Sequence, residues 1–228
     1  MESPLDRIFE DKELVNRIRE RLPYLFQLAE MESSRAGKIG MEVGSLREKI
    51  VIALLVHKFG KENVDTDIPI TEPETDVKLF GRPISVKTIT GMGGVKLAWT
   101  VDAQKAYEFR ENYVPKCDIV LVQIKWDDIE EGSFFYFPLE VQKRIFKEVG
   151  RQRYIELPKA GTNPRGVEFS KEALLRLMTD SCTKSIKISW RHSTIEYKPY
   201  QRWIEYWSRK DLPIQKKVFD ISDFGKKQ

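Results

Sequence analysis

A carboxylate and an ammonium group flank a short segment that has the features of a β-hairpin. Asp76 opens the strand-like residues 76–79, Lys87 lies in the strand-like residues 84–90, and Gly81 and Arg82 stand between them as a turn. A hairpin symmetric about that turn would place Asp76 opposite Lys87, with Ser85 on the same face, because side chains alternate along a strand. The opposite face would be apolar, with Val77 facing Val86 and Leu79 facing Ile84. One face is therefore expected to pack against the core and the other to carry chemistry.

Asp76 and Lys87 have the residue types needed for metal-assisted hydrolysis of a phosphodiester bond. A carboxylate can hold a hard divalent cation through oxygen. The cation polarises the phosphate and lowers the pKa of a bound water, and the lysine can orient that water and offset the charge of the transition state. The alternative for the pair is an ion pair between strands, worth about 0–1 kcal/mol if it is exposed.

Glu48 is the candidate for a second carboxylate at this site. Helical steps of three and four residues would direct it along the apolar stripe of a buried helix. The line of that stripe is Glu48, Ile52, Leu55 and Phe59. Ser45 and Glu48 also fit a capping box, in which Glu48 would instead satisfy backbone donors at the helix start. Two other carboxylates remain as fallbacks, Glu42 and, less strongly, Glu74.

The elements that must position these residues alternate between helices and strands. Apolar periodicity and capping residues predict helices near residues 14–28, 45–59, 102–111, 138–149, 170–178 and 199–207, with Pro23 kinking or splitting the first. Strands are expected at 63–70, 76–79, 84–90, 119–124, 134–137 and 186–190, and the uninterrupted 119–124 reads as a central strand. The order predicts an α/β fold with a mixed central β-sheet flanked by helices.

The domain organisation is expected to be simple. The chain has no internal repeat or long linker, so residues 1–228 are interpreted as a single domain. Its parts would be an N-terminal helical region (1–36), a catalytic core (45–190), and a C-terminal helix with a basic tail (191–228).

Composition narrows the function classes. With 41% hydrophobic and 32% charged residues, the 228-residue chain is typical of a globular protein. The net charge of +4 permits a polyanionic partner without requiring one. Two histidines and two separated cysteines argue against a histidine metal cluster, a Ser-His-Asp triad or a zinc site. No apolar run approaches the roughly 20 residues needed to span a bilayer. The acidic N-terminus is unlike a secretory signal, so a cytoplasmic protein without a membrane partner is expected.

A family resemblance sharpens the interpretation of the hairpin. Asp76, ten residues and then Lys87, preceded by a helix that carries Glu48, resembles the PD-(D/E)XK nuclease superfamily. Within it, the chain is similar to type II restriction endonucleases of the ThaI group, which is associated with CGCG sites. Two strings add to that similarity, residues 93–100 (GGVKLAWT) and 163–166 (NPRG). Two features depart from the pattern. Ser85 stands where the family usually has Asp or Glu, and the proline of the motif, Pro73, does not directly precede Asp76.

The resemblance implies an Mg²⁺-dependent endonuclease that acts on double-stranded DNA at a short, GC-rich palindromic site. Its catalytic residues would be Asp76, Lys87, Glu48 and Ser85. Its metal ligands would be Asp76, Glu48 and a main-chain carbonyl near Val86, and Ser85 leaves the number of metal ions open. A palindromic target makes a twofold-symmetric homodimer the natural assembly.

Two glycine-flanked methionines and several basic residues are candidates for DNA contact. Met92, beside Gly93, would enter between base steps as an apolar wedge, with Met41 as the alternative. Lys96 and Arg165 would contact phosphates or guanine, and guanine is the base that lysine and arginine most often read. Asn163, near Arg165, is a further candidate. Further basic candidates are Arg151, Arg153 and Lys159. The ordinary alternative for each is a flexible loop or a solvated charge.

Two other functions remain open at this point. A structure-specific or repair nuclease of the same superfamily would cut branched DNA and not a defined sequence. A DNA-binding module without catalysis would show salt-sensitive binding without metal-dependent cleavage. An interaction protein that binds no DNA is the remaining possibility.

Overall fold

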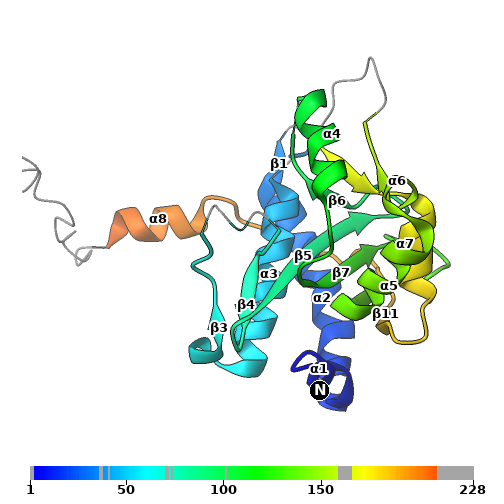
Figure 1. Cartoon of the computed structure of the whole chain (residues 1–228). Coiled ribbons are helices and arrows are strands. Elements are labelled where there is room, and N and C mark those ends of the chain that lie inside the picture. The colour runs from blue at the N-terminus through cyan, green and yellow to red at the C-terminus, as the bar shows by residue number, and fades with distance from the viewer. Residues whose placement is uncertain are drawn as a thin grey trace, which may run out of the picture. The chain divides into compact units, whose positions relative to one another are not determined.

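The computed structural model describes residues 3–35, 38–40, 42–69, 72, 74–100, 102–158 and 166–209 (Figure 1). The chain divides into two compact units, Met1–Thr194 and Ile195–Gln228. The second unit contains the amphipathic helix α8 (Gln201–Ser208), which has no buried residue. All remaining elements belong to the first unit.

A six-stranded mixed sheet forms the centre of the first unit. Its strand order is β11-β8-β7-β5-β4-β3, in which β5 and β7 run parallel and the other neighbours are antiparallel. The bounds are β3 Val64–Asp65, β4 Val77–Leu79, β5 Arg82–Thr90, β7 Asp118–Ile124, β8 Gly132–Phe137 and β11 Lys184–Ile188. The apolar run in β7 is buried because helices cover both faces of the sheet, which confirms the α/β prediction.

One face of the sheet packs against the N-terminal helices. These are α1 (Asp6–Glu10), α2 (Lys12–Ser33) and α3 (Val43–Phe59), and Figure 1 shows α2 and α3 alongside the sheet. The shared core contains Val77, Leu79, Ile84 and Val86 of the hairpin. The apolar face of the hairpin is therefore the predicted one.

The other face packs against a layer made of α4, α5, α6 and α7. Their bounds are α4 Ala103–Asn112, α5 Leu139–Val149, α6 Arg151–Tyr154 and α7 Lys171–Thr179. A small sheet, β6-β10-β9, contributes to the same core, with β6 Lys96–Ala98, β9 Ile155–Glu156 and β10 Val167–Phe169. Two minor elements complete the unit: the ribbon of β1 (Ser34–Arg35) with β2 (Lys38–Ile39), and a 3-10 turn at Lys61–Asn63.

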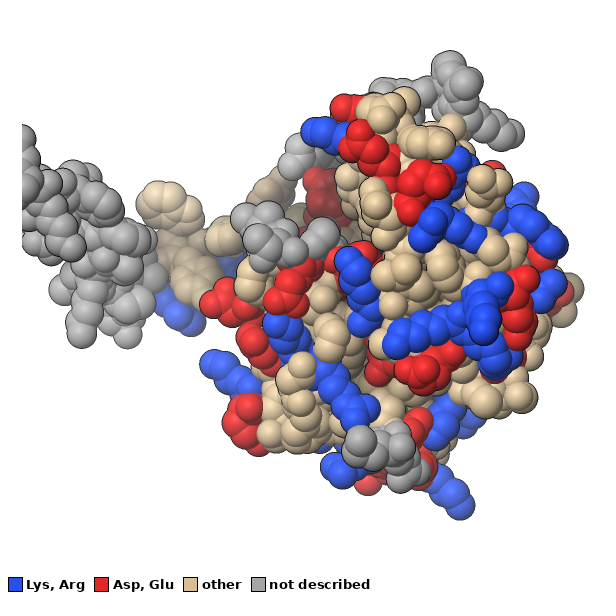
Figure 2. All heavy atoms as spheres, viewed as in Figure 1, with Lys and Arg blue, Asp and Glu red and all other residues tan. Residues whose placement is uncertain are grey.

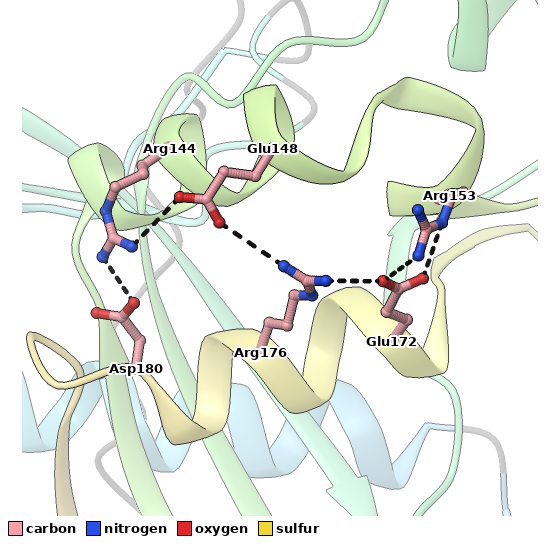
Figure 3. Close-up of polar contacts among 6 residues, drawn as sticks. All are labelled: Arg144, Glu148, Arg153, Glu172, Arg176 and Asp180. Atoms are coloured by element: carbon pink, nitrogen blue, oxygen red, sulfur yellow. Dashed lines mark hydrogen bonds and ion pairs between the residues drawn. The ribbon is translucent and has the colours of Figure 1, made fainter.

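The outer surface of α5, α6 and α7 carries a chain of ion pairs (Figure 3). Arg144 bonds Asp180 at 2.6 Å and Glu148 at 3.7 Å. Glu148 also lies 3.7 Å from Arg176, which lies 3.2 Å from Glu172, and Glu172 in turn accepts from Arg153. Figure 2 shows blue and red side chains interspersed over this part of the visible face.

Two local predictions about helices are wrong: the split of the first helix at Pro23 and the capping box at Ser45. Helix α2 continues through Pro23, which is buried, because packing of its neighbours Leu22 and Phe26 compensates for one missing backbone hydrogen bond. Helix α3 starts at Val43, whose amide donates to the carbonyl of Gly40. Ser45 therefore lies inside the first turn and caps nothing, so the capping box is absent.

Among the described residues, no helix combines the length and the apolar character needed to cross a lipid bilayer.

Candidate active site

The β4–β5 hairpin has a tighter turn than the sequence suggested. Leu79 pairs with Arg82 and Val77 with Ile84, so the turn consists of Phe80 and Gly81. Both turn residues have positive φ, 49° and 75°, as a two-residue type I′ turn requires. The predicted pairing of Asp76 with Lys87 is therefore wrong by two residues. A shift of two leaves every side chain on its expected face, and it brings Asp76 beside Ser85.

Three donors converge on one carboxylate oxygen of Asp76. The Oδ2 atom accepts hydrogen bonds from Ser85 Oγ at 3.0 Å, from the Val86 amide at 2.7 Å and from Lys87 Nζ at 3.2 Å. The Asp76 amide itself donates to the carbonyl of Ile84 at 3.0 Å, which fixes the backbone. The carboxylate is half-buried, and these donors hold it in one orientation.

The edge of β5 beyond Ile84 is open on the side of Asp76. Strand β4 begins at Val77, so its pairing with β5 ends at Ile84. The Val86 amide uses this free edge to reach Asp76. The amide and carbonyl of one strand residue project to the same side, so the Val86 carbonyl is expected on the same edge of β5 as the amide that reaches Asp76. This is the carbonyl that the sequence suggested as a metal ligand.

Helix α3 adds Glu48 to this neighbourhood. The stripe of α3 that is fully buried consists of Arg47, Val51, Leu55 and Phe59, and Glu48 lies next to it, half-buried. Burial raises the pKa of Glu48 to about 7, while the charge of Lys87 lowers it and the charge of Asp76 raises it further. Both residues of the hairpin therefore act electrostatically on Glu48, as expected when two carboxylates and one lysine share a site.

Lys116 and Gln142 are neighbours of the site that the sequence did not single out. Glu74, Lys116 and Gln142 line a small pocket together with Ser85 and Lys87. Burial raises the pKa of Glu74, and Lys116 and Lys87 lower it. The fallback carboxylate Glu74 is thus close to Lys87, and Lys116 becomes recognisable only because β7 starts beside β5.

The loop after β5 presents Met92 on an anchored backbone. Gly91 has a φ of 65°, and its amide donates to the Ile124 carbonyl at 2.7 Å. Gln123, which is buried, donates to the Gly91 carbonyl at 2.9 Å and to Met92 Sδ at 3.2 Å. Gly93 closes a turn on Thr90. The Met92 side chain is 62% exposed, so the loop holds an apolar group in solvent.

The other DNA-contact candidates have different surroundings. Lys96 forms an ion pair with Glu168. Arg153 pairs with Glu172, and Arg151 donates to the Tyr113 carbonyl, so both lie in the helical layer of α6. Four candidates lie outside the described residues: Met41, Lys159, Asn163 and Arg165.

The donor set suits a hard divalent cation. Asp76, Glu48 and the Val86 carbonyl offer oxygen atoms, which magnesium prefers to nitrogen or sulfur. Within the described part of the chain, no group of three or more His, Cys, Asp or Glu side chains is arranged to hold a metal ion. A cation at this site would therefore take its remaining ligands from the main chain, water and substrate.

Comparison with known proteins identifies the family of the chain. The sequence model of the family "Restriction endonuclease ThaI" matches residues 8–209. A solved structure described as a restriction endonuclease in complex with substrate DNA is 57% identical in sequence, with a TM-score of 0.84. The match covers 90% of this chain and 99% of that chain. No curated protein matches the chain.

Proposed function

Because this chain belongs to the ThaI restriction endonuclease family, and is thus a type II restriction enzyme that acts on DNA, we propose a magnesium-dependent reaction at a short palindrome. The family generally uses a divalent metal ion. The target proposed is GC-rich, with CGCG as the first candidate. The enzyme is proposed to hydrolyse one phosphodiester bond in each strand.

The observation that carries the proposed active site is the convergence of three donors on Asp76. A structural ion pair needs one lysine and one carboxylate, and it would not need Ser85 and the Val86 amide on the same oxygen. Holding a carboxylate rigidly at an open strand edge is what a metal ligand requires.

A divalent cation held by Asp76, Glu48 and the Val86 carbonyl would polarise the scissile phosphate and lower the pKa of a water molecule. Lys87 is proposed to orient the attacking water and to offset charge on the phosphoryl oxygens. Ser85 fixes the rotamer of Asp76 through its hydroxyl. Ser85 therefore replaces the usual second carboxylate with a positioning group, which supports a single metal ion.

DNA contact is proposed for the loop and strand that follow β5. Met92 would enter between base pairs, and Gly93 would let the backbone approach the duplex. Lys96 would contact a phosphate or a guanine. Three residues outside the described part of the chain remain candidates from the sequence: Met41 as the alternative wedge, and Asn163 and Arg165 from the string that resembles the family. Cutting both strands of a palindrome calls for two sites, so we propose a homodimer.

Plasmid cleavage tests the proposed site directly. Purified protein would be incubated with plasmid DNA and Mg²⁺, beside Asp76→Ala, Lys87→Ala and Lys78→Ala variants. Lys78 is the matched control, because it lies on the same face of the hairpin and pairs with Glu72 at 2.8 Å.

Discrete fragments are expected from the native enzyme and the Lys78 variant, and none with EDTA. The other two variants should lose about 10²–10³-fold or more in rate, the usual effect of removing a group that stabilises transition-state charge. Discrete cutting that survives both substitutions would refute this active site but not the nuclease. Cutting confined to branched DNA would refute the sequence-specific function.

A further inference from the structure

Lys96 is already engaged by an acidic residue in the free protein. Its Nζ lies 3.0 Å from Glu168 Oε1, and it also lies 4.8 Å from the ring centroid of Trp99. Trp99 is 71% exposed, so the lysine head group is at the surface. A phosphate that approached Lys96 would therefore meet the carboxylate of Glu168 at the same place.

The small sheet determines which way these groups face. Lys96 of β6, Glu168 of β10 and Glu156 of β9 are cross-strand partners, so their side chains share one face. Leu97 projects to the opposite face and lines the pocket that also contains Lys87. The face of β6 that bears Lys96 is therefore its outer surface, and the opposite face, which bears Leu97, borders the proposed active site.

Glu168 also contacts the loop that carries Met92. A Cβ atom at Gly94 would lie 1.7 Å from Glu168 Oε2, so the carboxylate occupies the space that any larger residue would need. The backbone next to Glu168 is fixed by a hydrogen bond from the Phe169 amide to the Val95 carbonyl, 3.0 Å long. The carboxylate of Glu168 therefore lies against the backbone of the proposed DNA-binding loop.

We propose that Glu168 is a specificity-determining residue that holds Lys96 in an internal ion pair and so weakens binding to non-target DNA. This inference rests on the proposed role of Lys96 in DNA contact. Exchanging Glu168 for DNA costs Lys96 its ion pair, so on non-target DNA Lys96 stays paired with Glu168 and makes no phosphate contact. Target DNA offsets that cost with its additional base contacts, whereas non-target DNA offers phosphates alone.

The proposal predicts a change in the salt dependence of binding. While Lys96 stays paired with Glu168, it neutralises no phosphate, so one fewer counterion is released from the DNA. Replacing Glu168 with Gln keeps the side-chain size and frees the lysine. Binding to non-target DNA should then tighten, and its dependence on salt should become steeper by about one counterion.

Binding would be measured by fluorescence anisotropy in EDTA, which prevents cleavage, on an alternating A·T duplex and on a duplex that contains CGCG. The variants are Glu168→Gln, Glu156→Gln, Lys96→Gln and the double variant Lys96→Gln with Glu168→Gln. Glu156→Gln is the matched control, because it removes the same charge from the adjacent strand. Glu156 makes no ion pair with any residue that the structure describes.

Glu168→Gln should bind the A·T duplex about three- to tenfold more tightly, with a slope of log K against log salt steeper by about 0.9. Glu156→Gln should change much less, and the double variant should lose the gain. Equal effects of Glu168→Gln and Glu156→Gln would overturn the proposal, as would a loss of CGCG binding in Glu168→Gln, which would make Glu168 a base-reading residue.

The Lys96→Gln variant separates this inference from the proposed function. Unchanged DNA binding in Lys96→Gln would remove Lys96 as a DNA contact and overturn the inference with it, while plasmid cleavage would still stand as the test of the nuclease. Weaker binding in Lys96→Gln with no effect of Glu168→Gln would overturn the inference alone.

Discussion

The two helical layers of the molecule differ in where their ion pairs lie: at the surface in one layer and in the interior in the other. On the outer surface of α5, α6 and α7, the six residues of the ion-pair chain are mostly exposed, and each cation meets a carboxylate at the surface (Figure 3). On the other side of the sheet, α2 and α3 bury Glu30 and Arg47, with side chains 8% and 7% exposed. Helix α3 also places Glu48 near Asp76 and Lys87 of the proposed active site.

The buried pair is hydrogen-bonded to further groups in the interior. Glu30 Oε1 accepts from Arg47 and, at 2.7 Å, from the Trp126 indole. Arg47 also approaches Thr90 Oγ1 at 3.4 Å, at the end of the strand that bears Lys87. The exposed side chains of the outer ion pairs can exchange their partners for water. The buried pair of Glu30 and Arg47 instead fixes where α2, α3 and β5 meet. The comparison predicts very different responses to substitution.

The largest expected effect comes from breaking the buried pair. Glu30→Ala should lower the free energy of unfolding by about 3–5 kcal/mol, because Arg47 is left charged without a partner in the interior. Urea unfolding, followed by far-ultraviolet circular dichroism, measures the loss. The double variant Glu30→Leu with Arg47→Met is the control and should recover most of the stability, since an apolar pair needs no charge compensation. A loss below about 1 kcal/mol in the single variant would place this pair with the surface ones.

Glu48 should show an intermediate effect that depends on pH. Its folded-state pKa of about 7 lies above its ordinary value of 4.5, so the folded protein holds this proton to higher pH than the unfolded chain does. The resulting contribution to stability is fully present below pH 4.5 and is lost as the pH rises through about 7. In EDTA, Glu48→Gln should therefore gain about 1–3 kcal/mol relative to the native protein between pH 5 and pH 8.

Urea unfolding at several pH values checks that difference, and Glu42→Gln, an exposed carboxylate that precedes the same helix, is its control. A constant difference between Glu48→Gln and the native protein across this pH range would mean that Glu48 titrates like a solvated group.

The smallest effect is expected in the outer chain. Arg176→Ala removes the central guanidinium, yet it should change the free energy of unfolding by only about 0–1 kcal/mol, because the side chains are about half exposed and screened. Chemical unfolding at low and high salt measures this change, which should shrink as salt rises. A loss as large as that of Glu30→Ala would show that the chain acts as one structural unit.

Much of the fold could be predicted from local patterns in the sequence. The apolar run of β7 indicated a central strand, and Ser170 caps α7 by accepting from the Ala173 amide. Alternation in β4 and β5 gave the correct faces of the hairpin. Its register could not be predicted, because it depends on Phe80 adopting positive φ, which is rare outside glycine and its turn-forming relatives. Strands β6, β9 and β10 were missed, since two or three residues contain too little alternation to recognise.

The candidate site was predictable only where its residues are neighbours in the chain. Asp76, Ser85 and Lys87 lie within one hairpin, so their shared face followed from alternation alone. The electrostatic environment of Glu48, the position of Lys116 and the Lys96–Glu168 pair depend on contacts between distant segments. A single sequence contains no periodic signal for such contacts.

The parallel pairing of β5 with β7 has a consequence for where the proposed functional residues lie along the chain. Parallel neighbours cannot be joined by a tight turn, so the chain needs a long crossover, residues 91–117, to return to the start of β7. That crossover carries Met92, Lys96 and Trp99, whereas Asp76, Ser85 and Lys87 precede it. The topology thus separates the two proposed sets of residues along the chain: the proposed DNA contacts lie within the crossover, and the hairpin that would hold the metal ion is complete before the crossover begins.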